Sequence, residues 1–304
     1  MNKIGRSESM AEVYLEARRD FLLRTQNLDG GWGYFPGKSS WLEPTAYAML
    51  ALDGGEKASV ALDRAWRVVA NWQLPDGGWR AGAQVQDGTW VSALAVTLCC
   101  IDGHREAMLK RGVERLLATE GAERCLTFRV MEFFGMGKVE GDTSHPAWPW
   151  RPGTSSWIEP TAHTIVALKL VQKRVRERGI AGRVHEGEQA ILARRCADGG
   201  WNHGSASTFN IAAPSYPEST ALALVGLQGR RKEVGGALDM ARSEWKTTQS
   251  PLAKVWLAIA LQAWGETLPA PANAPPGTDT MITALEAIAH PQGNHKLLRT
   301  EASA

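Results

Sequence analysis

The sequence predicts an all-α protein assembled from repeated helix–loop–helix units. An eleven-residue stretch at 36–46 returns 116 residues later at 152–162, with nine of the eleven positions identical. A second pattern, Asp-Gly-Gly-Trp, occurs at 29–32, 76–79 and 198–201. Internal repeats at such spacings are typical of arrays in which each unit packs on its neighbours. The chain is therefore predicted to be a tandem helical array.

Each Asp-Gly-Gly-Trp is predicted to end a helix. Glycine adopts the left-handed conformation without steric penalty, and the tryptophan that follows can cover the exposed helix end. Each eleven-residue copy predicts a helix start, because a glutamate and a proline (Glu43-Pro44 and Glu159-Pro160) precede an apolar run. The tryptophans of the pattern are predicted to be structural: Trp32, Trp79 and Trp201.

The helices divide into two kinds by their polarity. Amphipathic segments are expected on the outside and segments that are apolar nearly all round are expected inside. The expected outer helices cover residues 10–26, 62–73, 105–118, 186–196 and 234–245. The expected inner helices cover residues 43–52, 90–101, 126–136, 159–174, 218–227 and 251–264. Two inner helices in succession across 137–158 break strict alternation, so either one of them is misassigned or a last helix fills the gap.

The end of the chain is predicted to hold one more helix. Residues 268–277 are rich in proline, cannot be helical and form a spacer. Thr278 or Asp279 can then cap a last outer helix that ends at Ala289. We expect one domain over residues 1–289 and a disordered tail at 290–304.

Composition excludes several classes of function. With 304 residues, 44% of them apolar, the chain can bury a large core. Its 34 basic and 32 acidic residues leave a net charge of +2, which gives no general field for nucleic acid. The basic stretch 169–183 could meet a diphosphate or a peripheral membrane surface, although a solvated helix face is the other interpretation.

The expected location is the cytoplasm. The N-terminus has no apolar signal core, and no run of about 18 apolar residues occurs, so no integral membrane segment is expected. The cysteines form no Cys-x-x-Cys pair and are interpreted as reduced core thiols: Cys99, Cys100, Cys125 and Cys196.

The pattern Phe21-Leu22-x3-Gln26-x3-Gly30-x-Trp32, repeated in weaker form at 68–79, resembles a repeat of squalene–hopene cyclases. These enzymes belong to the terpenoid cyclase and protein prenyltransferase superfamily. The resemblance covers roughly residues 10–265. It implies an α/α toroid, in which about six inner helices are surrounded by about six outer ones, with a ligand bound at the mouth or centre of the ring.

The resemblance also points to candidate acids. Squalene–hopene cyclases protonate an alkene with an aspartic acid from an Asp-x-Asp-Asp-Thr-Ala corner. Residues 41–46 keep Thr-Ala and place Glu43 at the central aspartate, but the other two aspartates are replaced by Trp41 and Pro44. The implied function is a terpene cyclase-like enzyme that cyclises an isoprenoid by acid initiation, with Glu43, Glu159 or Glu218 as the acid. Helix capping, in which backbone N–H groups keep each glutamate ionised, is the alternative.

Further candidates surround these acids. Asp142, in the stretch 140–144, looks like the Asp-x-Asp-Thr-Thr variant of some cyclases, although a loop turn is the simpler interpretation. Aromatic side chains at or near the inner-helix starts can line a cavity and stabilise carbocations, or can pack between repeats. They are Trp41, Tyr47, Phe133, Phe134, Trp157, His163, Tyr216 and Trp256.

No metal or cofactor is expected. The stretch 33–39 is too short for a phosphate loop, which argues against a nucleotide site. No two aspartates are adjacent, so the Asp-Asp-x-x-Asp signature of metal-dependent terpene synthases is missing. The zinc ligands of prenyltransferases have no counterpart in this sequence either. The expected partner is a small-molecule isoprenoid, and the oligomeric state stays open. A non-catalytic toroid that binds a ligand or a protein, and a toroid that modifies peptides, are the alternative functions.

Overall fold

The computed structural model describes residues 10–124, 145–175, 179–208, 211–272 and 274–301. Apart from two short 3₁₀ turns, η1 (Ala122–Arg124) and η2 (Asn294–Leu298), the regular structure in these ranges is α-helical with one minimal hairpin. In the hairpin, β1 (Ser207–Thr208) pairs antiparallel with β2 (Ile211–Ala212), and Ser207 lies opposite Ala212. The prediction of an all-α protein is confirmed.

Six helices of the described chain form a closed inner ring. In order around the ring they are α2 (Leu42–Leu52), α4 (Ser92–Asp102), α7 (Ile158–Gln172), α9 (Pro217–Gly226), α11 (Pro251–Ala263) and α12 (Thr280–Ala289). Each packs on the next, and α12 packs on α2 to close the circle. The side chains of these helices are buried almost all round, because they meet neighbours on both sides and an outer helix behind.

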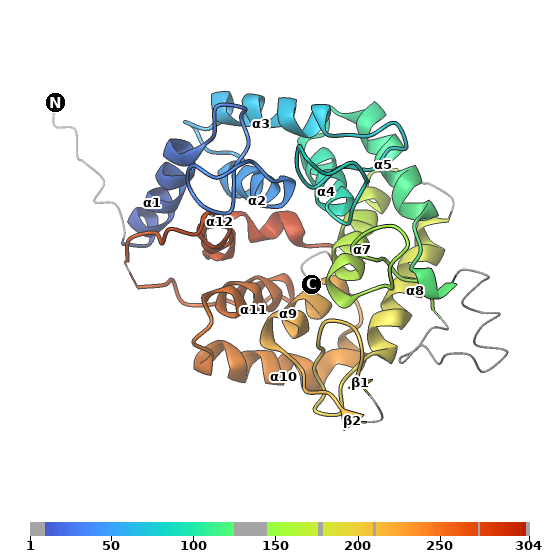
Figure 1. The fold of residues 1–304 in the computed structure, drawn as a ribbon. Coiled ribbons are helices and arrows are strands. Elements are labelled where there is room, and N and C mark those ends of the chain that lie inside the picture. The colour runs from blue at the N-terminus through green and yellow to red at the C-terminus, as the bar shows by residue number, and fades with distance from the viewer. Residues whose placement is uncertain (1–9, 125–144, 176–178, 209–210, 273, 302–304) are drawn as a thin grey trace, which may run out of the picture.

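The outer layer covers the ring from outside (Figure 1). It comprises α1 (Met10–Thr25), α3 (Ser59–Asn71), α5 (Glu106–Ala118), α8 (Ile180–Ala193) and α10 (Arg231–Thr247). Helix α1 packs on α12 and α2, α3 on α2, α5 on α4, α8 on α7, and α10 on α9 and α11. This two-layered ring is the α/α toroid that the resemblance implied.

The repeated tryptophans hold the ends of outer and inner helices together. Trp32 and Trp79 are fully buried, and each donates its indole N–H to the carbonyl of the residue ten positions earlier, at 2.8 Å in both cases. Trp201 makes the same bond to Ile191 at 2.6 Å. The backbone N–H of each tryptophan donates to a hydroxyl in the first turns of the next inner helix, such as Thr45 at 2.9 Å. This burial and bonding agree with the structural role predicted for these residues.

One helix differs from its predicted place. Residues 280–289 were expected in the outer layer, but α12 lies in the inner ring between α2 and α11. Its buried side chains include the small residues Thr283, Ala284 and Ala287, which allow close packing on both neighbours. The inner helix predicted at 126–136 lies outside the described residues.

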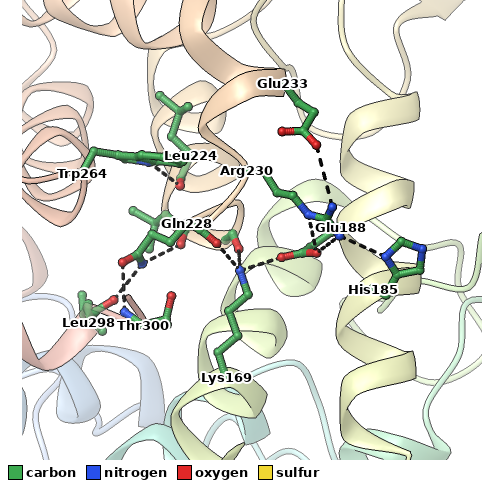
Figure 2. Close-up of polar contacts among 12 residues, drawn as sticks. Lys169, His185, Glu188, Leu224, Gln228, Arg230, Glu233, Trp264, Leu298 and Thr300 are labelled. Atoms are coloured by element: carbon green, nitrogen blue, oxygen red, sulfur yellow. Dashed lines mark hydrogen bonds and ion pairs between the residues drawn. The ribbon is translucent and has the colours of Figure 1, made fainter. Parts of the chain in front are cut away.

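The stretch after α12 is ordered, which contradicts the predicted disordered tail. Asn294 donates to the carbonyls of Leu50 (2.7 Å) and Asp53 (2.8 Å) at the end of α2. Beyond α9, the Gln228 amide donates to the carbonyl of Leu298 at 3.0 Å (Figure 2). The last carbonyls of a helix have no partner within it. Asn294 supplies donors to the end of α2 and Arg299 to Gln262 at the end of α11, while Leu298 accepts from Gln228, which explains why residues 290–301 pack on the ring.

The basic stretch is also bonded internally. The Lys169 ammonium contacts Glu188 at 2.7 Å and donates to the carbonyls of Gly226 and Gln228 (Figure 2). Arg174 donates to the carbonyl of Cys100, and Arg183 donates to that of Thr119. Lys169 and Arg183 are therefore held within the fold, whereas Lys173 and Arg174 stay exposed at the surface, as a solvated helix face would be.

Candidate active site

The starts of the inner helices meet at one mouth of the ring. Glu43, Glu159 and Glu218 lie in the first turns of α2, α7 and α9, and the charges of Glu43 and Glu218 both act on Glu159. Asp279 caps α12 by accepting the Ile282 N–H at 2.8 Å, and its charge acts on Glu43. The structure thus brings the three predicted glutamates together and adds an aspartate.

The side chain of Glu43 accepts a hydrogen bond from a tyrosine. The hydroxyl of Tyr34 donates to Glu43 Oε2 at 2.5 Å. Burial raises the pKa of Glu43, the Tyr34 hydrogen bond lowers it, and the charge of Asp279 raises it further. Burial and the same glutamate raise the pKa of Tyr34, so the tyrosine remains the donor.

Glu159 is the member of the group that retains a proton near neutrality. Burial, and then the charges of Glu43 and Glu218, raise its pKa to about 8. A carboxyl with that pKa is mostly protonated at pH 7. Among the described residues no backbone N–H donates to Glu43 or Glu159, so hydrogen-bonded capping does not describe either of them.

His163 follows Glu159 by one helical turn and is neutral. Its Nε2 lies 3.3 Å from the Tyr47 hydroxyl and 4.0 Å from Glu159 Oε1. Burial lowers the pKa of His163 to about 3. The contact between His163 and Glu159 is therefore one between two neutral groups at pH 7, not an ion pair.

Aromatic rings gather around this histidine. Ring centroids lie 5.3 Å away for Trp90, 5.6 Å for Trp256 and 6.3 Å for Tyr47. Tyr47 and Trp256 also meet edge to face, with centroids 5.7 Å apart. We call Tyr47, Trp90, His163 and Trp256 the aromatic cluster. Faces of tryptophan and tyrosine attract cations, so the cluster can stabilise positive charge close to Glu159.

The remaining predicted aromatics lie outside the aromatic cluster. Trp41 and Trp157, both 37% exposed, cover Gly82 and Gly204, where an added Cβ would come within 3.1 and 2.9 Å of the indole. Both rings pack between repeats, and Trp41 also lies near Tyr34, with ring centroids 6.2 Å apart. Tyr216 is 42% exposed and its ring lies 5.3 Å from that of His203. The candidates Phe133, Phe134 and Asp142 fall outside the described residues.

Sequence reasoning missed Tyr34, Trp90 and Asp279 as site residues. A signal for Trp90 exists in the repeat, because Trp79 bonds to Ser92 as Trp32 bonds to Thr45, thirteen residues on in both cases. Trp90 therefore occupies in the second unit the place that Glu43 occupies in the first. The sequence marked Asp279 only as a possible helix cap, and no local pattern marks Tyr34, since their partner Glu43 lies on a different element.

Two properties of the described residues bear on ligands. No group of three or more histidine, cysteine, aspartate or glutamate side chains in the described ranges is arranged to hold a metal ion. Nor does any helix in these ranges combine the length and the apolar content needed to cross a bilayer.

Comparison with known proteins gives partial sequence matches. No family model matches the chain. It is 43% identical over 79 residues to a drimenyl diphosphate synthase of Streptantibioticus cattleyicolor, which is 25% of this chain and 14% of that protein. A drimenyl diphosphate synthase of Streptomyces showdoensis is 45% identical over 62 residues, or 20% of this chain and 12% of that protein. The matched segments thus span only about one seventh of these relatives or less.

Solved structures share the fold. A protein from Actinoplanes superposes with a TM-score of 0.57 at 21% identity, over 84% of this chain and 75% of that one. A variant of the type II terpene cyclase MstE from Scytonema, bound to geranylgeranyl dihydroxybenzoate, gives 0.56 at 16% identity, over 95% of this chain and 78% of that one. An α-1,6-mannanase of Salegentibacter gives 0.64 at 8% identity, over 95% and 99%. The expected likeness to the terpenoid cyclase superfamily is confirmed as a likeness of fold, which unrelated chemistry shares.

Proposed function

We propose that this chain is a terpene cyclase-like enzyme that protonates an isoprenoid inside the ring, with Glu159 as the acid. The observation that carries the proposal is the carboxyl of Glu159, whose side chain is 22% exposed, which keeps its proton at neutral pH and lies 4.0 Å from His163 of the aromatic cluster. A general acid works best when its pKa is near the working pH. The partial similarity to drimenyl diphosphate synthases and the fold shared with MstE support an isoprenoid substrate.

The reaction balances without a cofactor. The Glu159 proton adds to one carbon of a substrate alkene, and the O–H electron pair stays on the carboxylate. The π electrons of a second alkene then form the ring C–C bond with the cationic carbon. The Trp90 and Trp256 rings and the Glu43 carboxylate stabilise the moving positive charge. Loss of a proton from carbon to a base restores an alkene, and water returns a proton to Glu159.

A non-catalytic toroid that binds a ligand is the second candidate. Two observations favour it: Pro44 replaces an aspartate of the cyclase corner, and Trp90 stands where another unit has an acid.

We also propose a cytoplasmic location, because Cys99, Cys100 and Cys196 are buried free thiols.

Incubation with linear isoprenoids separates the candidates. Neutral polyenes and isoprenoid diphosphates of several chain lengths would be offered to the wild type and to Glu159→Gln, with binding and products both measured. The proposal expects a cyclic product from the wild type and none from the variant, which keeps the side-chain volume but lacks the proton. Binding without product in the wild type would instead support the non-catalytic toroid.

A further inference from the structure

Tyr34 joins the starts of two inner helices. Its hydroxyl donates to Glu43 on α2 at 2.5 Å, and its carbonyl accepts the N–H of Thr280 on α12 at 2.8 Å. Its ring lies against Trp41, with centroids 6.2 Å apart. The preceding Gly33 permits this tight loop, since an added Cβ would lie 2.5 Å from the Lys38 carbonyl oxygen. The phenol is therefore held in place from three sides.

The second repeat copy lacks this phenol. The repeat that pairs Glu43 with Glu159 pairs Tyr34 with Trp150. Trp150 carries no hydroxyl, and its ring meets Trp90 edge to face at 5.0 Å. The two glutamates begin equivalent helices, yet within the described ranges a hydrogen-bond donor is bonded to Glu43 and none to Glu159.

The groups that face the two glutamates are acidic or neutral. Asp279 on α12 acts on Glu43. Glu43 on α2 and Glu218 on α9 act on Glu159, while His163 on α7 and Tyr47 on α2 are uncharged near neutrality. Trp90, in the turn just before α4, does not ionise. Among these groups, the Tyr34 hydroxyl is the donor that distinguishes one carboxyl from the other.

We infer that Tyr34 is a positioning residue, whose hydroxyl holds Glu43 as the carboxylate so that Glu159 is the member of the pair that keeps the proton. A hydrogen bond donated to a carboxylate favours the charged form. Two nearby carboxyls repel when both are ionised, so charge fixed on one raises the proton affinity of the other. The inference deepens the proposed function and rests on it for the catalytic use of that proton.

The test is Tyr34→Phe, which keeps the ring and removes the donor. The Glu43 carboxylate then loses its hydrogen bond, so more of the molecules that hold one proton carry it on Glu43 and fewer carry it on Glu159. We expect kcat/KM at neutral pH to fall, by at most about tenfold. The high-pH limb should not move to lower pH, because the pair as a whole binds its last proton at least as tightly. Tyr14→Phe is the matched control, since Tyr14 lies on the outer helix α1 against His290 and should leave kcat/KM unchanged.

A double variant sharpens the test. With Glu43→Gln already in place, Tyr34→Phe should cause no further loss of kcat/KM, because the carboxylate through which it acts is gone. Unchanged kcat/KM in a folded Tyr34→Phe protein, or an equal loss in the Glu43→Gln background, would overturn the inference.

A measurement without substrate separates this inference from the proposed function. The infrared band of protonated carboxyl groups at pH 7 should contain a component that Glu159→Gln removes and that Tyr34→Phe weakens. If that component behaves as expected but no isoprenoid is cyclised, the role of Tyr34 stands and the enzymatic proposal fails. If the component is unchanged in Tyr34→Phe, the inference fails whatever the activity.

Discussion

Tyr47 and His163 occupy the same position in two copies of the repeat and meet inside the ring, with the Tyr47 hydroxyl 3.3 Å from His163 Nε2. Each follows the glutamate of its own copy by four residues, so Glu43 and Glu159 lie one helical turn closer to the start of α2 and α7 than this contact. The repeat places equivalent side chains face to face, and differences between the copies then create an asymmetric site.

The first prediction concerns the protonation of His163. Burial lowers its pKa to about 3, and the Tyr47 hydroxyl can donate to Nε2, which leaves the proton on Nδ1. Nitrogen NMR of the imidazole should therefore show one neutral tautomer throughout the range from about pH 8 down to about pH 5. Titration of His163 near its ordinary pKa of about 6.5 would contradict the buried, neutral assignment.

The second prediction links Glu159 to stability. The pKa of Glu159 is about 8 in the folded protein and 4.5 for a free glutamate, which stands for the unfolded chain. The folded protein therefore binds this proton more tightly. This contribution is fully present below about pH 4.5 and is lost as the pH rises through about 8. Between pH 5 and pH 9, the wild type should lose more stability than Glu159→Gln, by at most about 4 kcal/mol. Denaturant unfolding of both proteins at the two pH values measures this, and parallel pH dependence would rule out a raised pKa.

The third prediction concerns the repeated tryptophans. Trp79→Ala should lower the free energy of unfolding by about 3 kcal/mol, because it removes a fully buried ring and its bond to the Val69 carbonyl. Trp41→Ala should cost less, since that ring is 37% exposed. Loss of activity in Trp79→Ala at an unchanged melting temperature would show that the residue is functional rather than structural.

The fourth prediction tests the packed stretch after α12. Asn294→Ala removes two hydrogen bonds to carbonyls at the end of α2 and should cost about 1 to 2 kcal/mol of unfolding free energy. Gln249→Ala is the control, because Gln249 is exposed and donates only to Thr247. Equal melting temperatures for the two variants would mean that residues 290–301 add nothing to the ring.

The repeats made the ring predictable, whereas single elements without a repeat signal were not. Trp32 and Trp79 mark unit boundaries because the physics of a helix end is local. Helix α12 follows a proline-rich spacer outside the repeats and was expected in the outer layer, although its residues are apolar nearly all round. Its contact with α2 closes the circle. The hydrogen bonds of Asn294 could not be predicted, because its partners Leu50 and Asp53 are far away in the sequence.

The site was predictable only in part for the same reason. Glu43 and Glu159 were recognised from their repeated helix starts, and the ring brought them within electrostatic reach. Which glutamate keeps the proton depends on Tyr34, on burial and on charges from α9 and α12. These are relationships across the ring that no spacing along the chain encodes.

The most direct test of acid initiation by Glu159 is the reaction of a linear isoprenoid in deuterated water. Exchangeable carboxyl groups then carry deuterium, so a product that begins with proton transfer from Glu159 should contain one deuterium on carbon. Mass spectrometry should show that single deuterium in the wild-type product, with no product from Glu159→Gln and retained product from Glu43→Gln. A cyclic product without deuterium, or turnover by Glu159→Gln at the wild-type rate, would contradict Glu159 as the initiating acid.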